Sequence, residues 1–239
     1  MHASRISELL DPYLGPPDGR RLTPDALKRI STYIDLLQRW NARVNLTAIR
    51  NEEEIVTRHF GESLFAARHL FPKDKNETGV PQVSPHLPEV GTPTTGSEVT
   101  AGETRLADVG SGAGFPAIPI KLWAPEISLT LIESNQKKAT FLGEVTRALT
   151  LTDVNVKNGR AESLSDMKFA VVTLRAVERF ESVLPVAAGL VAKGGRLALL
   201  IGESQLTQIH SSPLSTMNWS PPILIPDSKS RILAIAMNQ

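Results

Sequence analysis

From Arg105 onward, short apolar runs alternate with helical stretches, and this alternation constrains the fold more than any other feature of the chain. The apolar runs are Leu106–Val109, Leu129–Ile132, Val154–Val156, Ala170–Leu174, Arg196–Ile201, Ile223–Ile225 and Ile232–Met237. Helical stretches at Pro116–Trp123, Gln136–Leu149 and Glu178–Ala192 separate most of the early runs. Strands that alternate with helices form a parallel sheet with helices on both faces. Because no helix separates the last two runs, we expect an α/β fold whose seven-stranded, mostly parallel sheet ends in a hairpin with one antiparallel strand.

The first 72 residues have a different pattern, which predicts an N-terminal helical extension packed on the core. Thr23–Asp25 reads as a helix start, with a capping hydroxyl, a proline at the first helical position and an acid in the first turn. Apolar residues follow at helical spacing as far as Val44. Asn51, with Glu54 three residues later, resembles a capping box that opens a second helix.

The next segment, residues 73–104, is rich in proline, glycine and threonine and has no hydrophobic period. Such a composition cannot bury enough apolar surface to offset the entropy lost on ordering. We therefore predict a low-complexity insertion or linker at 73–104, which separates the helical extension at 1–72 from a core domain at 105–239.

Composition excludes several classes of site. The chain has no cysteine, which excludes disulfides, thiolate metal sites and cysteine nucleophiles. No apolar run approaches the roughly 20 residues of a membrane span, and the N-terminus lacks the pattern of a signal peptide. We therefore expect a cytoplasmic protein with no membrane partner. We further expect a monomer that holds no metal. The net charge of +1, from 26 basic and 25 acidic residues, does not by itself indicate a nucleic-acid partner.

The segment Asp108–Pro116, Asp-Val-Gly-Ser-Gly-Ala-Gly-Phe-Pro, follows the first apolar run and precedes a helix. In that context, glycines let backbone N–H groups approach a ligand closely, and Gly112 stands where the backbone would meet it. A dinucleotide site would need its third glycine at the position of Phe115, and the lysine of a phosphate-binding loop is absent. The spacing Gly-x-Gly-x-Gly after a strand that ends in Asp is typical of S-adenosylmethionine sites. The alternative is a tight strand–helix turn of the kind found in any α/β protein.

A second acidic position supports a nucleoside ligand. Glu133 ends the second apolar run, 19 residues after Gly114. An acid at the end of the second strand can accept hydrogen bonds from both hydroxyls of a ribose. The alternative is a solvated acid at a helix start, beside Ser134. Together, the loop and Glu133 favour a nucleoside-bearing cofactor.

With these motifs the chain resembles the bacterial 16S ribosomal RNA guanine-N7 methyltransferases, also called the glucose-inhibited division protein B family. The resemblance covers about 33–72 and 105–202. The segments that carry it are Trp40-Asn41, Asn45-Leu46-Thr47, Arg58-His59, Glu62-Ser63-Leu64, Asp108–Pro116, Pro119, Pro125, Gln136-Lys137-Lys138, Phe141-Leu142, Gly159–Glu162 and Arg175-Ala176.

The resemblance implies a Rossmann-like fold, S-adenosyl-L-methionine as cofactor, and 16S ribosomal RNA or the small ribosomal subunit as partner. It further implies that Gly110 and Phe115 shape the loop against the cofactor and that Ala161 and Glu162 lie beside the adenine. Arg175 would be a cofactor-site residue that reaches the methionine carboxylate, since a guanidinium presents a planar fork of donors. Otherwise Arg175 is a surface arginine at a strand end.

Other basic residues keep two interpretations. His59 is either a helix-packing histidine or an RNA contact, and Lys137 and Lys138 are either phosphate contacts or solvated lysines on a helix. The chain also departs from the family pattern. Relatives commonly have Lys where Ile201 stands, an aliphatic residue at Gly61, often Asp at Glu62, and an Arg-His pair where this chain reads Arg231-Ile232.

The implied reaction needs no acid–base dyad, because guanine N7 carries a free lone pair and requires alignment and electrostatics alone. No catalytic residue is assigned. The Pro-Pro motif of amino-group methylases follows their fourth strand and ends in an aromatic residue, whereas Ser220–Ile223 follows the fifth and lacks one. Methylation of another acceptor, a small molecule or protein, and a non-catalytic ribosomal-RNA-binding assembly factor remain alternatives. An NAD oxidoreductase is less favoured, given the glycine spacing.

Overall fold

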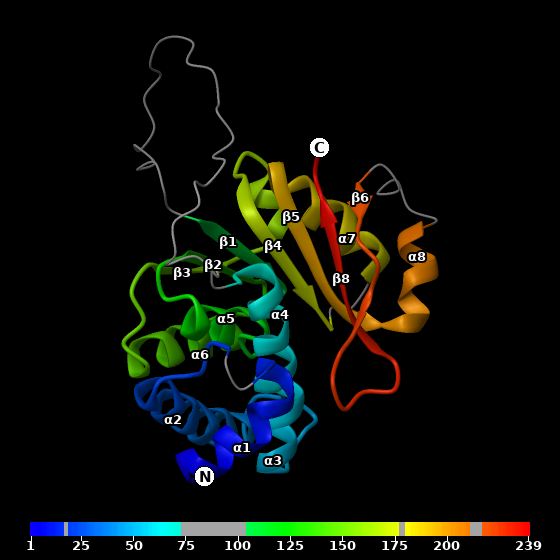
Figure 1. The fold of residues 1–239 in the computed structure, drawn as a ribbon. Coiled ribbons are helices and arrows are strands. Elements are labelled where there is room, and N and C mark those ends of the chain that lie inside the picture. The colour runs from blue at the N-terminus through cyan, green and yellow to red at the C-terminus, as the bar shows by residue number, and fades with distance from the viewer. Residues whose placement is uncertain (17–18, 73–103, 177–179, 211–216) are drawn as a thin grey trace.

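The computed structural model describes residues 1–16, 19–72, 104–176, 180–210 and 217–239 (Figure 1). Residues 73–103, nearly all of the segment predicted as an insertion or linker, lie outside the described residues.

One eight-stranded sheet forms the core, in the order β3-β2-β1-β4-β5-β8-β6, with β7 also paired to β8. The strands are β1 Arg105–Val109, β2 Ser128–Glu133, β3 Val154–Asn158, β4 Phe169–Arg175, β5 Val191–Gly202, β6 Asn218–Trp219, β7 Ile223–Leu224 and β8 Arg231–Met237. Strands β1 to β5 are parallel, and β8 is antiparallel to β5. All seven predicted runs form strands. The additional strand β6 has only two residues, too few for a hydrophobic period to reveal it.

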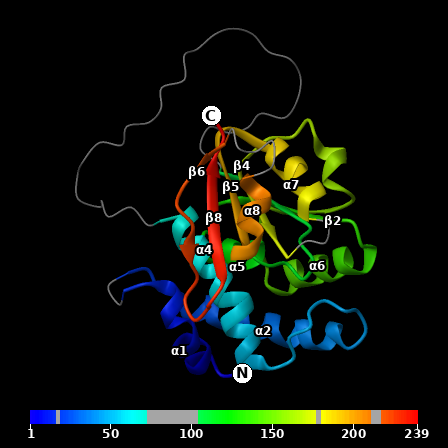
Figure 2. The ribbon, with the colours of Figure 1, turned by 90° about the vertical axis from the view of Figure 1, so that its right-hand side faces the viewer.

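Alternate residues of the strands pack on opposite faces of the sheet. Leu106 and Val171 belong to one hydrophobic cluster, whereas their neighbours Ala107 and Val172 belong to a second. The first face is covered by α5 (Ala117–Trp123), α6 (Gln136–Ala148) and the N-terminal helices; the second is covered by α7 (Phe180–Gly189) and α8 (Leu206–His210). Figures 1 and 2 show these helices on the two sides of the sheet. Two short 3-10 helices, Ala161–Leu164 and Glu203–Gln205, complete this half of the chain.

The helix predicted to reach Ala192 ends earlier, and this part of the prediction was wrong. The chain is already a strand at Val191, which pairs with Phe169 of β4. The register between β4 and β5 then shifts, and Gly194 takes a left-handed conformation with φ of 72°. Pairing with β4 therefore outweighs the helical propensity of the residues after Gly189.

Two of the N-terminal helices begin where the sequence predicted, at Thr23 and Asn51, whereas α1 (Ala3–Leu14) was not predicted. The other helices of this unit are α2 (Pro24–Asn41), α3 (Glu52–Glu54), a π-helical segment η1 (Ile55–Gly61) and α4 (Glu62–Leu70). The Thr23 hydroxyl accepts a hydrogen bond from the Ala26 N–H at 3.1 Å, and the Asn51 side chain accepts one from the Glu54 N–H at 3.0 Å. Both predicted N-caps are therefore present.

Helix α2 ends at Asn41, so the helical spacing counted as far as Val44 overestimated its length. The buried Asn41 side chain explains the stop. Its oxygen accepts hydrogen bonds from the N–H groups of Leu46 and Thr47, at 2.9 and 3.1 Å, and its amide donates to the Thr47 carbonyl at 2.9 Å. These three bonds fold the chain back into a fixed loop, because they satisfy backbone groups that a helix would otherwise use.

Side chains of the N-terminal helices pack directly on the sheet domain. The buried Tyr33 ring of α2 contacts Phe60 of η1, Phe115 of the glycine loop and Phe141 of α6. The Trp40 indole N–H donates to the Glu144 carboxylate at 3.0 Å. Within the part of the chain that the structure describes, no helix is long and apolar enough to cross a membrane.

Candidate functional site

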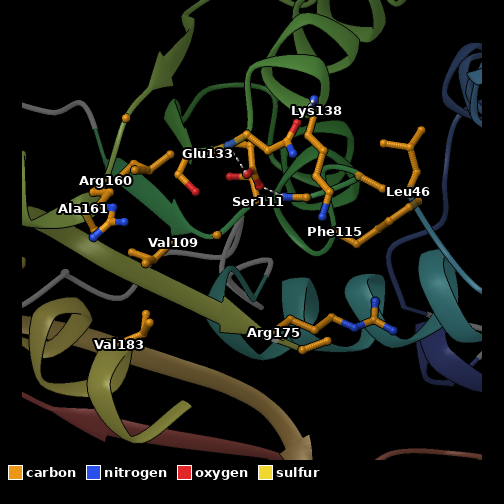
Figure 3. Close-up of a pocket in the computed structure, with 18 of the residues that line it drawn as sticks. Leu46, Val109, Ser111, Phe115, Glu133, Lys138, Arg160, Ala161, Arg175 and Val183 are labelled. Carbon is orange, nitrogen blue, oxygen red and sulfur yellow. Dashed lines mark hydrogen bonds between the residues drawn. The ribbon is translucent and has the colours of Figure 1, made fainter. Parts of the chain in front are cut away.

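A pocket of about 770 Å³ opens at the carboxyl ends of β1, β2 and β4 (Figure 3). Its lining comes from the glycine loop, from Glu133 and the following turn, from Gly159–Glu162, from the end of β4, from α7, and from the N-terminal residues Leu46, Thr47, Ala48 and His59. Strand order reverses between β1 and β4, and open α/β sheets bind ligands at the carboxyl ends of strands at this reversal.

The glycine loop is fixed to the end of β2. The N–H groups of Gly110 and Ser111 donate to the Ile132 carbonyl at 2.9 and 3.0 Å, and the Gly114 N–H donates to the Ser111 carbonyl at 2.6 Å. Gly112 and Gly114 have φ of 54° and 87°, in the left-handed region that disfavours larger residues. A Cβ on Gly114 would lie 2.6 Å from a methyl group of Ile118, whereas a Cβ on Gly112 would meet only the Gly110 carbonyl oxygen, at 3.8 Å, an ordinary contact. The loop therefore packs against the protein at Gly114 and is accessible at Gly112.

The Glu133 carboxylate organises the adjacent turn. It is buried and accepts hydrogen bonds from the Gly112 N–H at 2.8 Å and from the Asn135 N–H at 2.7 Å. The close-up shows it pointing into the pocket beside Ser111. Glu133 is thus not a solvated helix-start acid. Asn135 fills that role instead, since its side chain caps α6 by accepting from the N–H groups of Lys137 and Lys138.

Asp108 is a second buried acid under the loop, and the sequence reasoning gave it no role beyond ending the strand. Its Oδ1 accepts a hydrogen bond from the Thr173 hydroxyl at 2.6 Å, while Oδ2 is buried without a partner. Burial raises the pKa of Asp108 to about 7, although the Thr173 hydroxyl opposes the rise. Polar residues at neighbouring positions of two otherwise apolar strands were the available signal.

Arg175, at the end of β4, contacts the N-terminal helices. Its Nη2 donates to the Arg58 carbonyl at 2.7 Å and to the Glu62 carboxylate at 3.0 Å. The other oxygen of Glu62 accepts from Arg231 Nε at 2.5 Å. One buried carboxylate therefore holds two arginines from distant strands. Arg175 lines the pocket, so it is not the isolated surface arginine of the alternative interpretation.

A stack of aromatic rings connects the interior to the pocket. The rings of Tyr33 and Phe115 are nearly parallel at 5.3 Å between centroids, and those of Phe115 and His59 are nearly parallel at 4.7 Å. Phe60 meets Phe115 edge to face at 5.1 Å, and the Tyr33 hydroxyl donates to the Ala113 carbonyl. Phe115 is therefore held from several sides, and the glycine loop is anchored to α2 and η1.

His59 has both a packing contact and a place in the pocket lining. A hydrogen bond of 2.8 Å joins its Nε2 to the Thr47 hydroxyl oxygen, which also accepts from the Ile49 N–H at 3.1 Å. Burial, with Arg175 and Arg58 nearby, lowers the pKa of His59 to about 3. The ring is therefore neutral at physiological pH.

The remaining predicted residues divide by exposure. Ala161 is buried in the lining, and Glu162 lies beside it with an exposed side chain. Lys138 also lines the pocket, whereas Lys137 is exposed. Among the described residues, no group of three or more histidine, aspartate or glutamate side chains is placed to hold a metal ion.

Known proteins match this chain over most of its length. The family described as GidB, rRNA small subunit methyltransferase G, matches residues 26–80 and 94–218. The chain belongs to this family. The "Ribosomal RNA small subunit methyltransferase G" of Halorhodospira halophila is 39% identical over 192 residues, 80% of this chain and 77% of that protein. The protein of the same name from Neisseria meningitidis is 33% identical over 82% of this chain and 80% of its own length. Among solved structures, a ribosomal protein L11 methylase from Lactobacillus delbrueckii aligns over 59% of this chain and 72% of that one, at 18% identity and a TM-score of 0.48.

Two positions noted above as expected departures from the family pattern have packing contacts in this structure. Gly61 leaves room for the Tyr13 ring of α1, because a Cβ there would lie 2.7 Å from the ring. Ile201 is buried in the second hydrophobic cluster and pairs with Ile232 of β8.

Proposed function

We propose that this protein transfers the methyl group of S-adenosyl-L-methionine to N7 of a guanine in 16S ribosomal RNA. The observation that carries the proposal is the composition of the pocket. The glycine loop and Glu133 line one part of it and residues of the N-terminal helical unit line another, in a chain that belongs to the rRNA small subunit methyltransferase G family.

The residues present fit the cofactor. Gly112 leaves backbone accessible in the lining. Each oxygen of the Glu133 carboxylate accepts one hydrogen bond from the backbone and has a further lone pair for a ribose hydroxyl. Ala161 and Glu162 would flank the adenine, and Gly110 and Phe115 would shape the loop. A contact between Arg175 and the methionine carboxylate remains a prediction, because the guanidinium bonds described for it go to Glu62 and to carbonyl oxygens of η1.

The proposed reaction requires the protein to align donor and acceptor but not to remove a proton. S-adenosylmethionine supplies a methyl group on a positively charged sulfur. The N7 lone pair forms the new C–N bond as the C–S bond breaks with its electrons on sulfur, and the positive charge passes to the base. Because no proton leaves N7, alignment of donor and acceptor replaces general base catalysis. A neutral His59 suits a site that holds a cation before and after transfer.

Label transfer tests the function directly. Purified protein is incubated with methyl-labelled S-adenosylmethionine and, in parallel, with small ribosomal subunits, naked 16S RNA or lysate proteins. The expected result is label in ribosomal RNA. The position is then mapped by borohydride reduction and aniline cleavage, because N7-methylation makes the glycosidic bond labile. One cut should be present in wild-type cells, absent in a deletion strain and restored by the gene. Label on another acceptor with an unchanged cleavage pattern would contradict the ribosomal assignment.

A further inference from the structure

We propose that Leu46, Thr47, Ala48 and His59 form the acceptor side of the pocket, and that the target purine stacks on the ring of His59. We call these four residues the acceptor wall. The inference rests on the proposed function and deepens it, because it assigns the acceptor base to named residues of the N-terminal helical unit.

The pocket divides by the origin of its lining. Every residue predicted to contact the cofactor comes from the sheet domain, between Gly110 and Arg175. The acceptor wall comes from the loop after α2 and from η1, and it lines the same pocket. Figure 3 shows Leu46 near Phe115 on one side of the pocket, and Arg160 and Ala161 on the other, beyond Glu133. With the adenosine between Glu133 and Ala161, the wall faces the part of the pocket that the adenosine leaves free.

The aromatic stack makes His59 a suitable platform. Tyr33 is fully buried, Phe115 is nearly parallel to it, and His59 is nearly parallel to Phe115 and lines the pocket. The stack therefore starts in the interior and ends at the pocket with His59. Planar bases stack on such rings, and alanine substitution of a stacking ring typically weakens binding roughly 10- to 100-fold.

One hydrogen bond to the His59 ring, at Nε2, orients it, and a second layer of hydrogen bonds holds the partner; the other ring nitrogen, Nδ1, is buried without one among the described residues. Thr47 holds Nε2 at 2.8 Å, and the Thr47 backbone is itself held at both its N–H and its carbonyl by the buried Asn41 side chain. This loop carries Leu46 and Ala48 into the lining on either side of Thr47. A platform held in this way loses little freedom when a base stacks on it.

Charge supports the same assignment. The low pKa of His59, about 3, keeps the imidazole neutral beside the basic residues Arg58 and Arg175. The transferred methyl group leaves a positive charge on the base. A neutral π face attracts a cation, whereas an imidazolium would repel it.

Three variants test the acceptor wall. We expect His59→Ala to lower kcat/KM for methylation of small subunits by roughly 10- to 100-fold, while the Kd for S-adenosylmethionine, measured by calorimetry, stays within about threefold. His59→Phe keeps a stacking ring and should recover most of the loss. His69→Ala is the matched control, since His69 lies in α4 with its ring against Phe65 and should leave both quantities unchanged.

The outcomes separate the inference from the function on which it rests. Wild-type activity on subunits together with an unaffected His59→Ala would overturn the acceptor wall. So would a His59→Phe protein as impaired as His59→Ala, because the ring would then not act by stacking. An equal loss of cofactor affinity would place His59 on the donor side. If the wild-type protein labels no RNA, the proposed function fails and the purine assignment fails with it. Should His59→Ala be unfolded by circular dichroism, Thr47→Val decides instead. It removes the hydroxyl that orients the ring, together with that hydroxyl's bond to the Ile49 N–H, and should give a smaller loss in the same direction while cofactor affinity stays unchanged.

Discussion

The ion pairs of the buried Glu62 carboxylate should contribute more to the free energy of unfolding than an ion pair on the surface. The variant Glu62→Gln measures this contribution. The Glu62 side chain is 2% exposed and holds Arg175, whose side chain is 12% exposed, and Arg231, at 31%. Removing one partner of a buried ion pair costs about 3–5 kcal/mol, because the remaining charges stay desolvated. Glutamine keeps one acceptor oxygen and Arg231 is partly hydrated, so we expect the lower end, about 3 kcal/mol. For a protein of this size that corresponds to a fall in Tm of roughly 6–12 °C.

The assay is thermal and urea unfolding of the variant beside a matched control. Glu53→Gln is suitable, because Glu53 also binds an arginine, Arg5, at 2.8 Å, but with a side chain that is 52% exposed. Ion pairs open to water contribute little, so the control should unfold close to the wild type. Equal shifts in Tm for the two variants would refute the reasoning, because they would show that burial of the Glu62 pairs adds nothing.

Two further substitutions address the glycine loop and the acid below it. Asp108→Asn should stabilise the protein more at pH 8 than at pH 5. The raised pKa of about 7 means that neutral Asp108 favours folding and that this contribution is lost as the pH rises through 7. Urea midpoints at the two pH values check this, and a larger gain at pH 5 would contradict it. Gly112→Val should abolish binding of S-adenosylmethionine in calorimetry, since a branched residue at φ of 54° is strained by about 1–2 kcal/mol and adds bulk to a loop that lines the pocket. The helical Gly143→Ala, whose added Cβ would meet no atom within 4 Å, should bind normally. Binding of NADH in place of the methyl donor would show that the cofactor is misassigned.

The parts of the fold set by local chemistry were predictable. The Thr23 and Asn51 side chains cap their helices by accepting from the N–H group three residues later. These bonds depend only on residues close in sequence, so the sequence alone indicates them. The conformation of η1 was not predictable, since an α-helix and a π-helix share one hydrophobic pattern over so few residues. The end of α7 depends on the pairing of Val191 with Phe169, which only the assembled sheet provides.

In the site, too, the contacts between neighbouring strands were predictable and the long-range contacts were not. The glycine loop and Glu133 lie on adjacent strands, so their proximity followed from the strand–helix alternation. The contact of Glu62 with Arg175 and Arg231 joins residues 113 and 169 positions apart, and no local spacing indicates it. The two positions of His59, against Phe115 and in the pocket lining, likewise depend on how the helical unit meets the sheet.

The bond between the Tyr33 hydroxyl and the Ala113 carbonyl has a consequence during translation. The two residues are 80 positions apart, so at 5–20 residues per second a ribosome needs about 4–16 s to synthesise the second after the first. Throughout that interval the Tyr33 ring lacks its stacking partner Phe115, and Phe141 is made later still, so of the three rings that contact Tyr33 in the folded protein only Phe60 can already be present. A chain released before that point would lack these contacts permanently and should be removed by cellular proteases.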